Sequence, residues 1–137
     1  MAKTATAARM LDRGIVAGPY DCAVHYELRP RFRIVSSDGT VVLGPGKADL
    51  LDAIARTGSI RAAAEELEMS YMRAWTLVRT MNAAFRAPLV EKERGGAEQG
   101  GAQLTKSGKN VLRLYRRMEE KAEKTVGPLW EKLQEEL

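Results

Sequence analysis

The sequence predicts a mostly α fold with a small β component: a winged helix-turn-helix with an N-terminal β-hairpin and a long C-terminal helix. Three observations predict it. Apolar residues recur at helical spacing in three consecutive segments between residues 47 and 85, and two of these begin at a serine that can cap a helix. Two short strand patterns then flank a glycine-rich stretch. A long amphipathic helical pattern completes the chain.

The length of the chain, 137 residues with 45% apolar and 29% charged, suits one domain with a buried core. We expect residues 1–22 to form a mobile N-terminal arm, because they show no hydrophobic period, and residues 23–137 to form the domain. Neither a membrane-spanning apolar run nor a signal-peptide pattern is present. These features predict a cytoplasmic protein with no membrane partner.

The chain has one cysteine, Cys22, and one histidine, His25. They cannot form an intrachain disulfide and are too few for a structural zinc site, which takes four ligands. No nucleophile has a base beside it in a recognisable motif. We therefore expect no metal site, no cofactor and no enzymatic activity.

The N-terminal β-hairpin is predicted by strand-forming residues around a turn signal. Residues 23–28 are rich in strand formers, and residues 31–35 alternate between apolar and basic side chains. Asp38-Gly39 can form the turn, because glycine adopts positive φ without steric cost, and a second strand follows at 41–43. Residues 44–46, Gly-Pro-Gly, are expected to end the hairpin.

Three helices are predicted after the hairpin. The first runs from Lys47 to Arg56 and stops at Gly58, and the second is capped by Ser59. Ser70 caps a third helix that extends to about Phe85. The third helix has an inner stripe in which we expect Trp75 to be core. The inner stripe comprises Tyr71, Ala74, Trp75, Val78, Met81 and Phe85, and the outer face comprises Met72, Arg73, Thr76, Arg79 and Ala83.

Strands at residues 89–92 and 102–104 flank a glycine-rich segment, 95–101, that we interpret as the tip of a wing. This segment lacks the Gly-Lys-Ser/Thr ending of a nucleotide-binding P-loop. Thr105 is expected to cap the last helix, and Gly127-Pro128 to bend or break it into stretches 105–126 and 128–137. Both stretches have an apolar face, which predicts either a homodimer or packing against the hairpin at 31–43.

Positive charge is concentrated in residues 69–117, which contain ten basic and three acidic residues and so carry a net charge of +7. Such a patch indicates a polyanionic partner, with a merely solvated basic face as the alternative. A helix fits the major groove of double-stranded DNA, and its first turn meets the base edges. Arg73 can pair with guanine, Met72 can pack on a thymine methyl, and the start of the second helix can hold phosphate. The candidate DNA-binding residues are Ser59, Ser70, Tyr71, Met72, Arg73, Thr76, Arg79, Lys92, Arg94 and Lys106.

The stretch Thr57–Trp75, TGSIRAAAEELEMSYMRAW, resembles the DNA-binding part of ModE-type molybdate-responsive transcription regulators. The resemblance continues through Met81-Asn82, the segment 89–91, the glycine-rich wing and Gly108, and covers about residues 44–117. It implies a LysR-like winged helix that dimerises, partly through its long helices, and binds palindromic operators. We therefore expect a homodimer bound to double-stranded DNA.

The expected function is that of a sequence-specific transcription regulator of ModE type. Members of the family carry C-terminal β-barrel modules that bind molybdate or tungstate, whereas no β-pattern follows the matched region up to Leu137. We therefore expect that the sensor module is missing, so that the resemblance implies DNA binding and not molybdate binding. The alternative is a winged-helix interaction module that pairs with another regulator without reading DNA.

Overall fold

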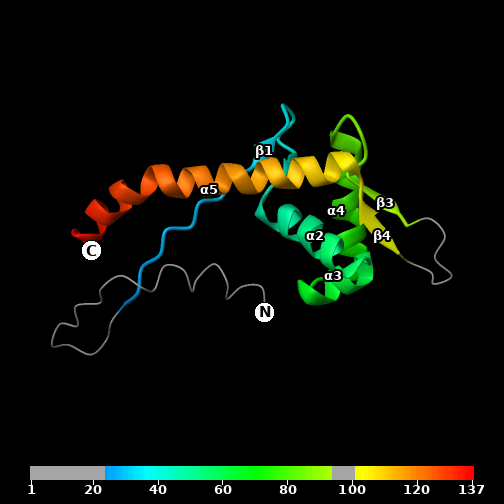
Figure 1. Cartoon of the computed structure of the whole chain (residues 1–137), viewed down its shortest axis with the longest axis horizontal. Coiled ribbons are helices and arrows are strands. Elements are labelled where there is room, and N and C mark those ends of the chain that lie inside the picture. The colour runs from blue at the N-terminus through cyan, green and yellow to red at the C-terminus, as the bar shows by residue number, and fades with distance from the viewer. Residues whose placement is uncertain (1–23, 94–100) are drawn as a thin grey trace.

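The computed structural model describes residues 24–93 and 101–137, so the arm expected over residues 1–22 lies outside the described residues. It confirms the predicted winged helix-turn-helix with an N-terminal hairpin and a long C-terminal helix (Figure 1). The elements in chain order are β1 (Ile34–Val35), β2 (Val41–Leu43), α2 (Pro45–Thr57), α3 (Ile60–Glu66), α4 (Tyr71–Ala84), β3 (Val90–Lys92), β4 (Ala102–Leu104) and α5 (Lys106–Gln134).

The hairpin turn forms where the sequence predicts it. Gly39 adopts a φ of 87°, and the carboxylate of Asp38 accepts hydrogen bonds from the hydroxyl of Ser36 and from the amide of Thr40. These donors lower the pKa of Asp38 to about 2, because they stabilise the charged carboxylate. The antiparallel strands β1 and β2 pair Ile34 with Leu43.

Two predictions for this region are wrong. The strand expected over residues 23–28 is absent from residues 24–28, which are exposed and pair with no described strand, and the strand expected over 31–35 is reduced to β1. The hairpin ends at Leu43, directly before Gly44, as expected, but α2 begins at Pro45, two residues before the predicted start at Lys47. Pro45 is tolerated there because the first amides of a helix have no intrahelical acceptor to lose.

The predicted caps are all present. Ser59 accepts a hydrogen bond from the amide of Ala62 at 3.2 Å, Ser70 from that of Arg73 at 3.1 Å, and Thr105 from that of Gly108 at 3.0 Å. Gly58 ends α2 with a left-handed φ of 69°. Each hydroxyl satisfies an amide that its helix cannot, which fixes where α3, α4 and α5 begin.

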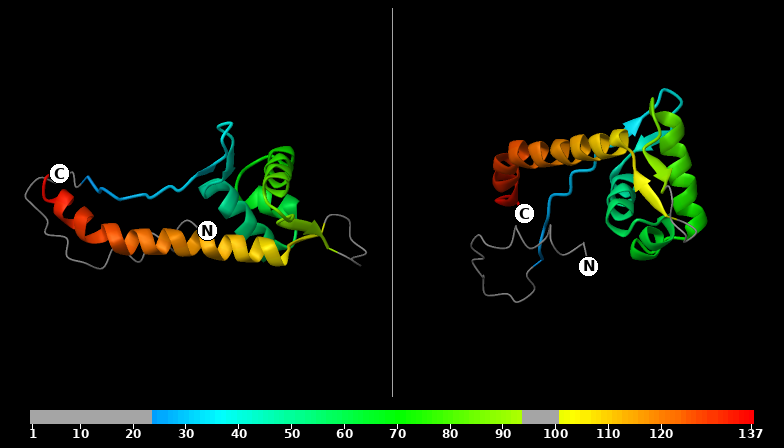
Figure 2. Two further views of the ribbon diagram at one scale, coloured as in Figure 1. Left: turned by 90° about the horizontal axis from the view of Figure 1, so that it is seen from above. Right: turned by 45° about the vertical axis from the view of Figure 1, so that its right-hand side comes forward.

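The core lies between α2, α3 and α4, with β2 and the wing strands β3 and β4 at its edges (Figure 2). Leucines 50 and 51 and Ile54 of α2 are fully buried, and small alanines let the helices approach closely. These alanines are Ala63, Ala64 and Ala74. Trp75, predicted to be core, packs against the core but is only partly buried.

Asn82 joins the recognition helix α4 to β3. Its side-chain oxygen accepts from the amides of Leu89, at 2.8 Å, and Val90, at 3.1 Å, while its amide donates to the carbonyl of Val90 at 3.0 Å. We expect Asn82→Ala to lower the free energy of unfolding by about 2 kcal/mol, since these amides would lose their partner. Chemical denaturation measures it, with Asn110→Ala as the control because Asn110 is exposed on α5. Equal stability of the two variants would contradict this role.

The last helix is continuous through Pro128, so of the bend or break expected at Gly127-Pro128 the structure shows the bend. It bends because proline has no amide to bond within the helix, and the final turns leave the line of the others (Figure 1). The first half of α5 is anchored by Tyr115, whose buried hydroxyl donates to the carbonyl of Phe32 at 2.8 Å. The second half projects beyond the other helices, where Leu129 is 66% exposed. Packing against the hairpin therefore accounts for only the first half.

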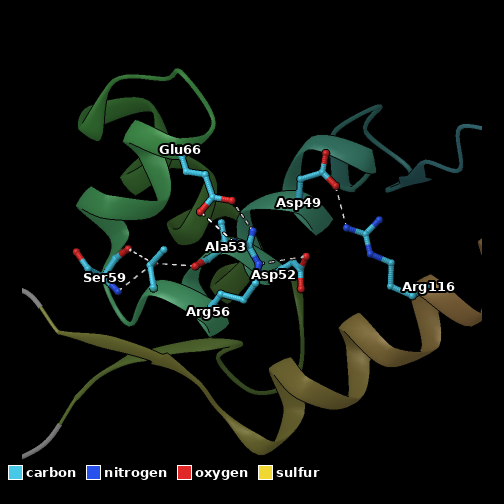
Figure 3. A network of polar contacts seen from close by, with 8 residues as sticks. Asp49, Asp52, Ala53, Arg56, Ser59, Glu66 and Arg116 are labelled. Carbon is cyan, nitrogen blue, oxygen red and sulfur yellow. Dashed lines mark hydrogen bonds and ion pairs between the residues drawn. The ribbon is translucent and has the colours of Figure 1, made fainter. Parts of the chain in front are cut away.

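A polar network holds α2 to its neighbours (Figure 3). Arg56 makes two hydrogen bonds to Glu66 of α3, at 2.6 and 3.1 Å, and Arg116 of α5 donates to Asp49 of α2 at 2.8 Å.

No helix within residues 24–93 and 101–137 combines the length and apolar character needed to cross a membrane.

The hydrogen bond from Arg56 lowers the pKa of Glu66 below its ordinary value. A lowered carboxyl pKa stabilises the fold above the unfolded-state pKa, and this contribution disappears as the pH falls through the folded-state pKa. The stability difference between the unmodified protein and Glu66→Gln should therefore be largest near neutral pH and vanish in acid. Urea denaturation from neutral pH to about pH 3 measures it. Glu65→Gln is the control for removing a glutamate charge from α3, because Glu65 forms no ion pair with a described residue.

Candidate nucleic-acid interface

The outer face of α4 is a continuous solvent-exposed surface. Ala74, Val78 and Met81 are buried on the opposite face, which turns Met72, Arg73, Thr76 and Arg79 outward. Met72 is 69% exposed, although burying it in the protein would be favourable. The hydroxyl of Thr76 donates to the carbonyl of Met72 at 2.9 Å, which leaves its methyl group and an oxygen lone pair toward solvent. Four of the predicted residues therefore share one face.

The basic residues of this face differ from those of α2 and α5. Arg56 and Arg116 are held by carboxylates, and their charges serve to join helices. Within residues 24–93 and 101–137, neither Arg73 nor Arg79 forms an ion pair with a carboxylate. Their guanidinium groups are therefore available to an external anion or base edge.

A hollow separates α3 and α4 from the wing, which we define as β3, β4 and the residues between them. Predicted residues Ser59, Tyr71 and Lys92 line it together, as does Trp75. The guanidinium carbon of Arg61 lies 4.7 Å from the centre of the Tyr71 ring, a cation–π contact that places a positive charge at its edge. The hollow is therefore bounded by aromatic rings and basic side chains that reach out from three elements.

The base of the wing is fixed to the start of α3. Ser59 pairs with Gly101 as an isolated β-bridge, and the amide of Ala102 donates to the carbonyl of Gly58 at 2.9 Å. In the wing strands, Lys92 pairs with Ala102 across the ladder. These bonds set the distance between the wing and α4.

The charge of the wing is mixed. Lys92 is exposed, but Glu91 and Glu93 stand on either side of it and also line the hollow. Two carboxylates weaken the attraction of this part of the surface for phosphate. Arg94, predicted as a wing contact, lies outside the described residues. Unlike Lys92 on the wing, Arg73 and Arg79 of α4 have no carboxylate beside them in sequence.

The remaining predicted residues occupy helix starts. Ser70 is exposed at the cap of α4, beside the outer face. Lys106 is exposed as the first residue of α5 and is not among the residues of the hollow. In the structure, the side-chain oxygen of Ser59 accepts a hydrogen bond from the amide of Ala62, so Ser59 acts as a helix cap. A phosphate contact by Ser59 stays a prediction.

Two residues of the site were missed by the sequence analysis. Arg61 reaches Tyr71 across the turn between α3 and α4, and the helical i to i+4 rule cannot find a contact between different helices. Asn82 bonds to β3 through a pairing that only the tertiary fold creates. Neither residue has a local signal in the sequence.

Comparison with known proteins agrees with this geometry. Residues 47–109 match the family of bacterial regulatory helix-turn-helix proteins, lysR family. The chain is 37% identical over 101 residues to the molybdenum transport protein ModE of Azotobacter vinelandii, a match that covers 74% of this chain and 37% of that protein. It is 45% identical over 73 residues to the molybdenum-pterin-binding protein MopB of Rhodobacter capsulatus, covering 53% of this chain and 27% of that protein.

The DNA-binding transcriptional dual regulator ModE of Escherichia coli K12 is 39% identical over 71 residues, covering 52% of this chain and 27% of that protein. The chain thus spans between 27% and 37% of the length of these relatives. Among solved structures, the CbnR DNA-binding domain in its DNA complex superposes with a TM-score of 0.52 at 23% identity, over 64% of this chain and 95% of that one. This last likeness supports the fold. Residues 47–109 are thus similar to the helix-turn-helix domain of the lysR family, and the chain is similar to the DNA-binding regulator ModE over about half of its length.

Proposed function

We propose that this chain acts as a sequence-specific transcription regulator of ModE type that binds double-stranded DNA through α4. The observation that carries the proposal is the outer face of α4, where two arginines without a described carboxylate partner lie beside the exposed Met72. The relatives named ModE support the same role, one of them being a DNA-binding regulator. Such a role belongs in the bacterial cytoplasm, where the DNA is, and requires no catalytic step.

In the proposed complex, α4 lies in the major groove with Arg73, Met72 and Thr76 toward the base edges. Arg73 supplies two donors to guanine, and Met72 supplies apolar contact to a thymine methyl. Ser70, Tyr71 and Arg79 contact the phosphates on either side of the helix. Ser59, Lys92 and Lys106 extend these phosphate contacts toward the wing and the start of α5.

We propose that two copies bind a palindromic site as a homodimer through α5. The second half of this helix carries Leu129 and Leu133, which are 66% and 53% exposed, and it projects beyond the other helices in Figure 1. Burying apolar residues of this kind against a second copy is favourable. Two-fold symmetry then places the two copies of α4 in half-sites about 34 Å apart.

The test is selection of genomic fragments on the purified protein, followed by sequencing of what is retained. A palindromic site recovered upstream of a few genes is the expected result, and its affinity should fall steeply between about 50 and 200 mM salt because phosphate contacts release counterions. An arm with molybdate, motivated by the names of the relatives, shows whether recovery responds to the oxyanion. Uniform recovery of all fragments, or of none, would contradict sequence-specific binding and favour an interaction module.

A further inference from the structure

The segment that precedes β1 has the pattern of a strand but no strand beside it. From residue 24 to residue 32, even positions are Val, Tyr, Leu, Pro and Phe, and odd positions are His, Glu, Arg and Arg. Val24, Tyr26 and Leu28 are 67%, 50% and 37% exposed. No backbone hydrogen bond joins residues 24–31 to another described residue, and Figure 2 shows the segment extending away from α2, α3 and α4. Its backbone and its apolar face are both available to a partner strand.

We propose that residues 24–32 pair with the same residues of a second copy as an antiparallel β-ribbon whose two-fold axis passes through Leu28. This inference rests on the homodimer proposed above but not on DNA binding. It adds a second contact between the copies, at the opposite end of the domain sequence from the exposed half of α5.

The charges of the segment select this register. With the axis at Leu28, Glu27 of each copy lies opposite Arg29 of the other, so that two opposite-charge pairs form. An axis at residue 27 would place the two glutamates against each other, and an axis at residue 29 the two arginines. Registers shifted by one residue would set apolar side chains against charged ones. In the single chain, Arg29 bonds to Glu27 along the same strand, which shows that the two side chains can meet.

The backbone is compatible with the same register. In an antiparallel ladder, alternate residues direct both backbone groups toward the partner. If the odd-numbered residues form these hydrogen bonds, the backbone nitrogen of Pro30 points away from the partner strand. The absence of an N–H group on proline then costs no hydrogen bond of the ladder. The carbonyl of Phe32 also points away, in agreement with its hydrogen bond from Tyr115 at 2.8 Å. The Leu28 residues of the two copies then lie opposite each other as a non-hydrogen-bonded pair, the type of pair in which side chains are closest.

Apolar surface is available to cover the ribbon. Phe32, at the end of the segment, packs against the core, which places this end of the ribbon's apolar face next to the domain. Next to the Tyr115 anchor on α5, Leu114 and Met118 are 46% and 45% exposed. A two-stranded ribbon alone is marginally stable in water, and these side chains supply the packing that it needs.

Disulfide cross-linking tests the register. In a Cys22→Ser background, Leu28→Cys places two cysteines about 4.5 Å apart between Cα atoms, at the short end of the disulfide range. Val24→Cys is the matched control, because it lies on the same face but about 27 Å from its own copy in this register. Mild oxidation should give a covalent dimer at least about tenfold faster for Leu28→Cys. Equal rates, or no cross-link in a sample that sedimentation shows to be dimeric, would overturn the proposal.

Charge reversal provides a second measurement. Residues 27 and 29 are exposed, so these substitutions disturb no buried contact of the single chain. Glu27→Arg or Arg29→Glu should each weaken dimerisation by about tenfold, since two like-charge pairs would form, and the double exchange should restore it. Unchanged dimer dissociation constants, or a monomer at about 100 μM, would overturn the inference. The Leu28→Cys protein with Arg73 intact separates the two proposals: cross-linking without operator binding would contradict only the DNA-binding role, and operator binding without cross-linking would contradict only the ribbon.

Discussion

Gly108→Ala is expected to lower the free energy of unfolding by about 3 kcal/mol. Gly108 is buried in the first turn of α5, and a Cβ atom there would lie 2.1 Å from the carbonyl oxygen of Leu89. That oxygen is backbone, already accepts from the amide of Thr105 at 2.9 Å, and belongs to a residue with no exposed surface. Because neither backbone can yield as a flexible side chain would, α5 must move away from the segment that precedes β3. Urea denaturation measures the loss.

Gly46→Ala is the control for this substitution. Gly46 lies in α2, has nothing within 4 Å of an added Cβ, and should gain up to about 1 kcal/mol from the better helix propensity of alanine. A loss at Gly108 below about 1 kcal/mol would show that the contact between α5 and Leu89 yields without cost. The structure would then be wrong about how closely these backbones approach.

Arg73→Ala is expected to weaken binding to the selected operator by about 5- to 150-fold per half-site, which corresponds to about 1–3 kcal/mol. Arg73 is exposed in the first turn of α4, where a helix in the major groove meets the bases. Its guanidinium has no described carboxylate partner, so its removal should leave the fold intact. Competition with non-specific DNA should reveal a reduced preference at one base pair.

Arg33→Ala removes the same charge from the hairpin side of the molecule, away from α4 in sequence and exposed like Arg73. It should alter operator affinity only slightly and leave the base preference unchanged. If Arg73→Ala instead weakened all DNA sequences equally, Arg73 would be a phosphate contact and another residue of the outer face of α4 would read the base.

Local chemistry made most of the helices predictable. The serines at 59 and 70, Thr105 and Gly58 mark helix ends through hydrogen bonds and backbone angles that depend on a few neighbouring residues. The Asp38-Gly39 turn is local in the same way. The outer face of α4 followed from helical periodicity, because the burial of its opposite face requires only the 3.6-residue repeat.

What the sequence did not reveal depends on contacts between distant elements. The alternation before β1 predicts a strand, but a strand needs a partner, and the described part of one chain supplies none for residues 24–28. Pro128 predicts a bend or a break, and local sequence does not decide between them; in the structure α5 bends and continues. The contacts of Arg61 and Asn82 arise only when α3, α4 and β3 meet.

The continuity of α5 has a geometric consequence for the proposed dimer. One helix begins against the wing, at the buried Gly108, and ends in the exposed apolar residues proposed to meet a second copy. The 29 residues of α5 give about 43 Å of helix at 1.5 Å per residue, and the bend at Pro128 turns its final turns out of line with the rest. In the proposed dimer, the length and bend of α5 and the angle at which two copies of it cross therefore set the spacing and the rotation of the two copies of α4 on DNA.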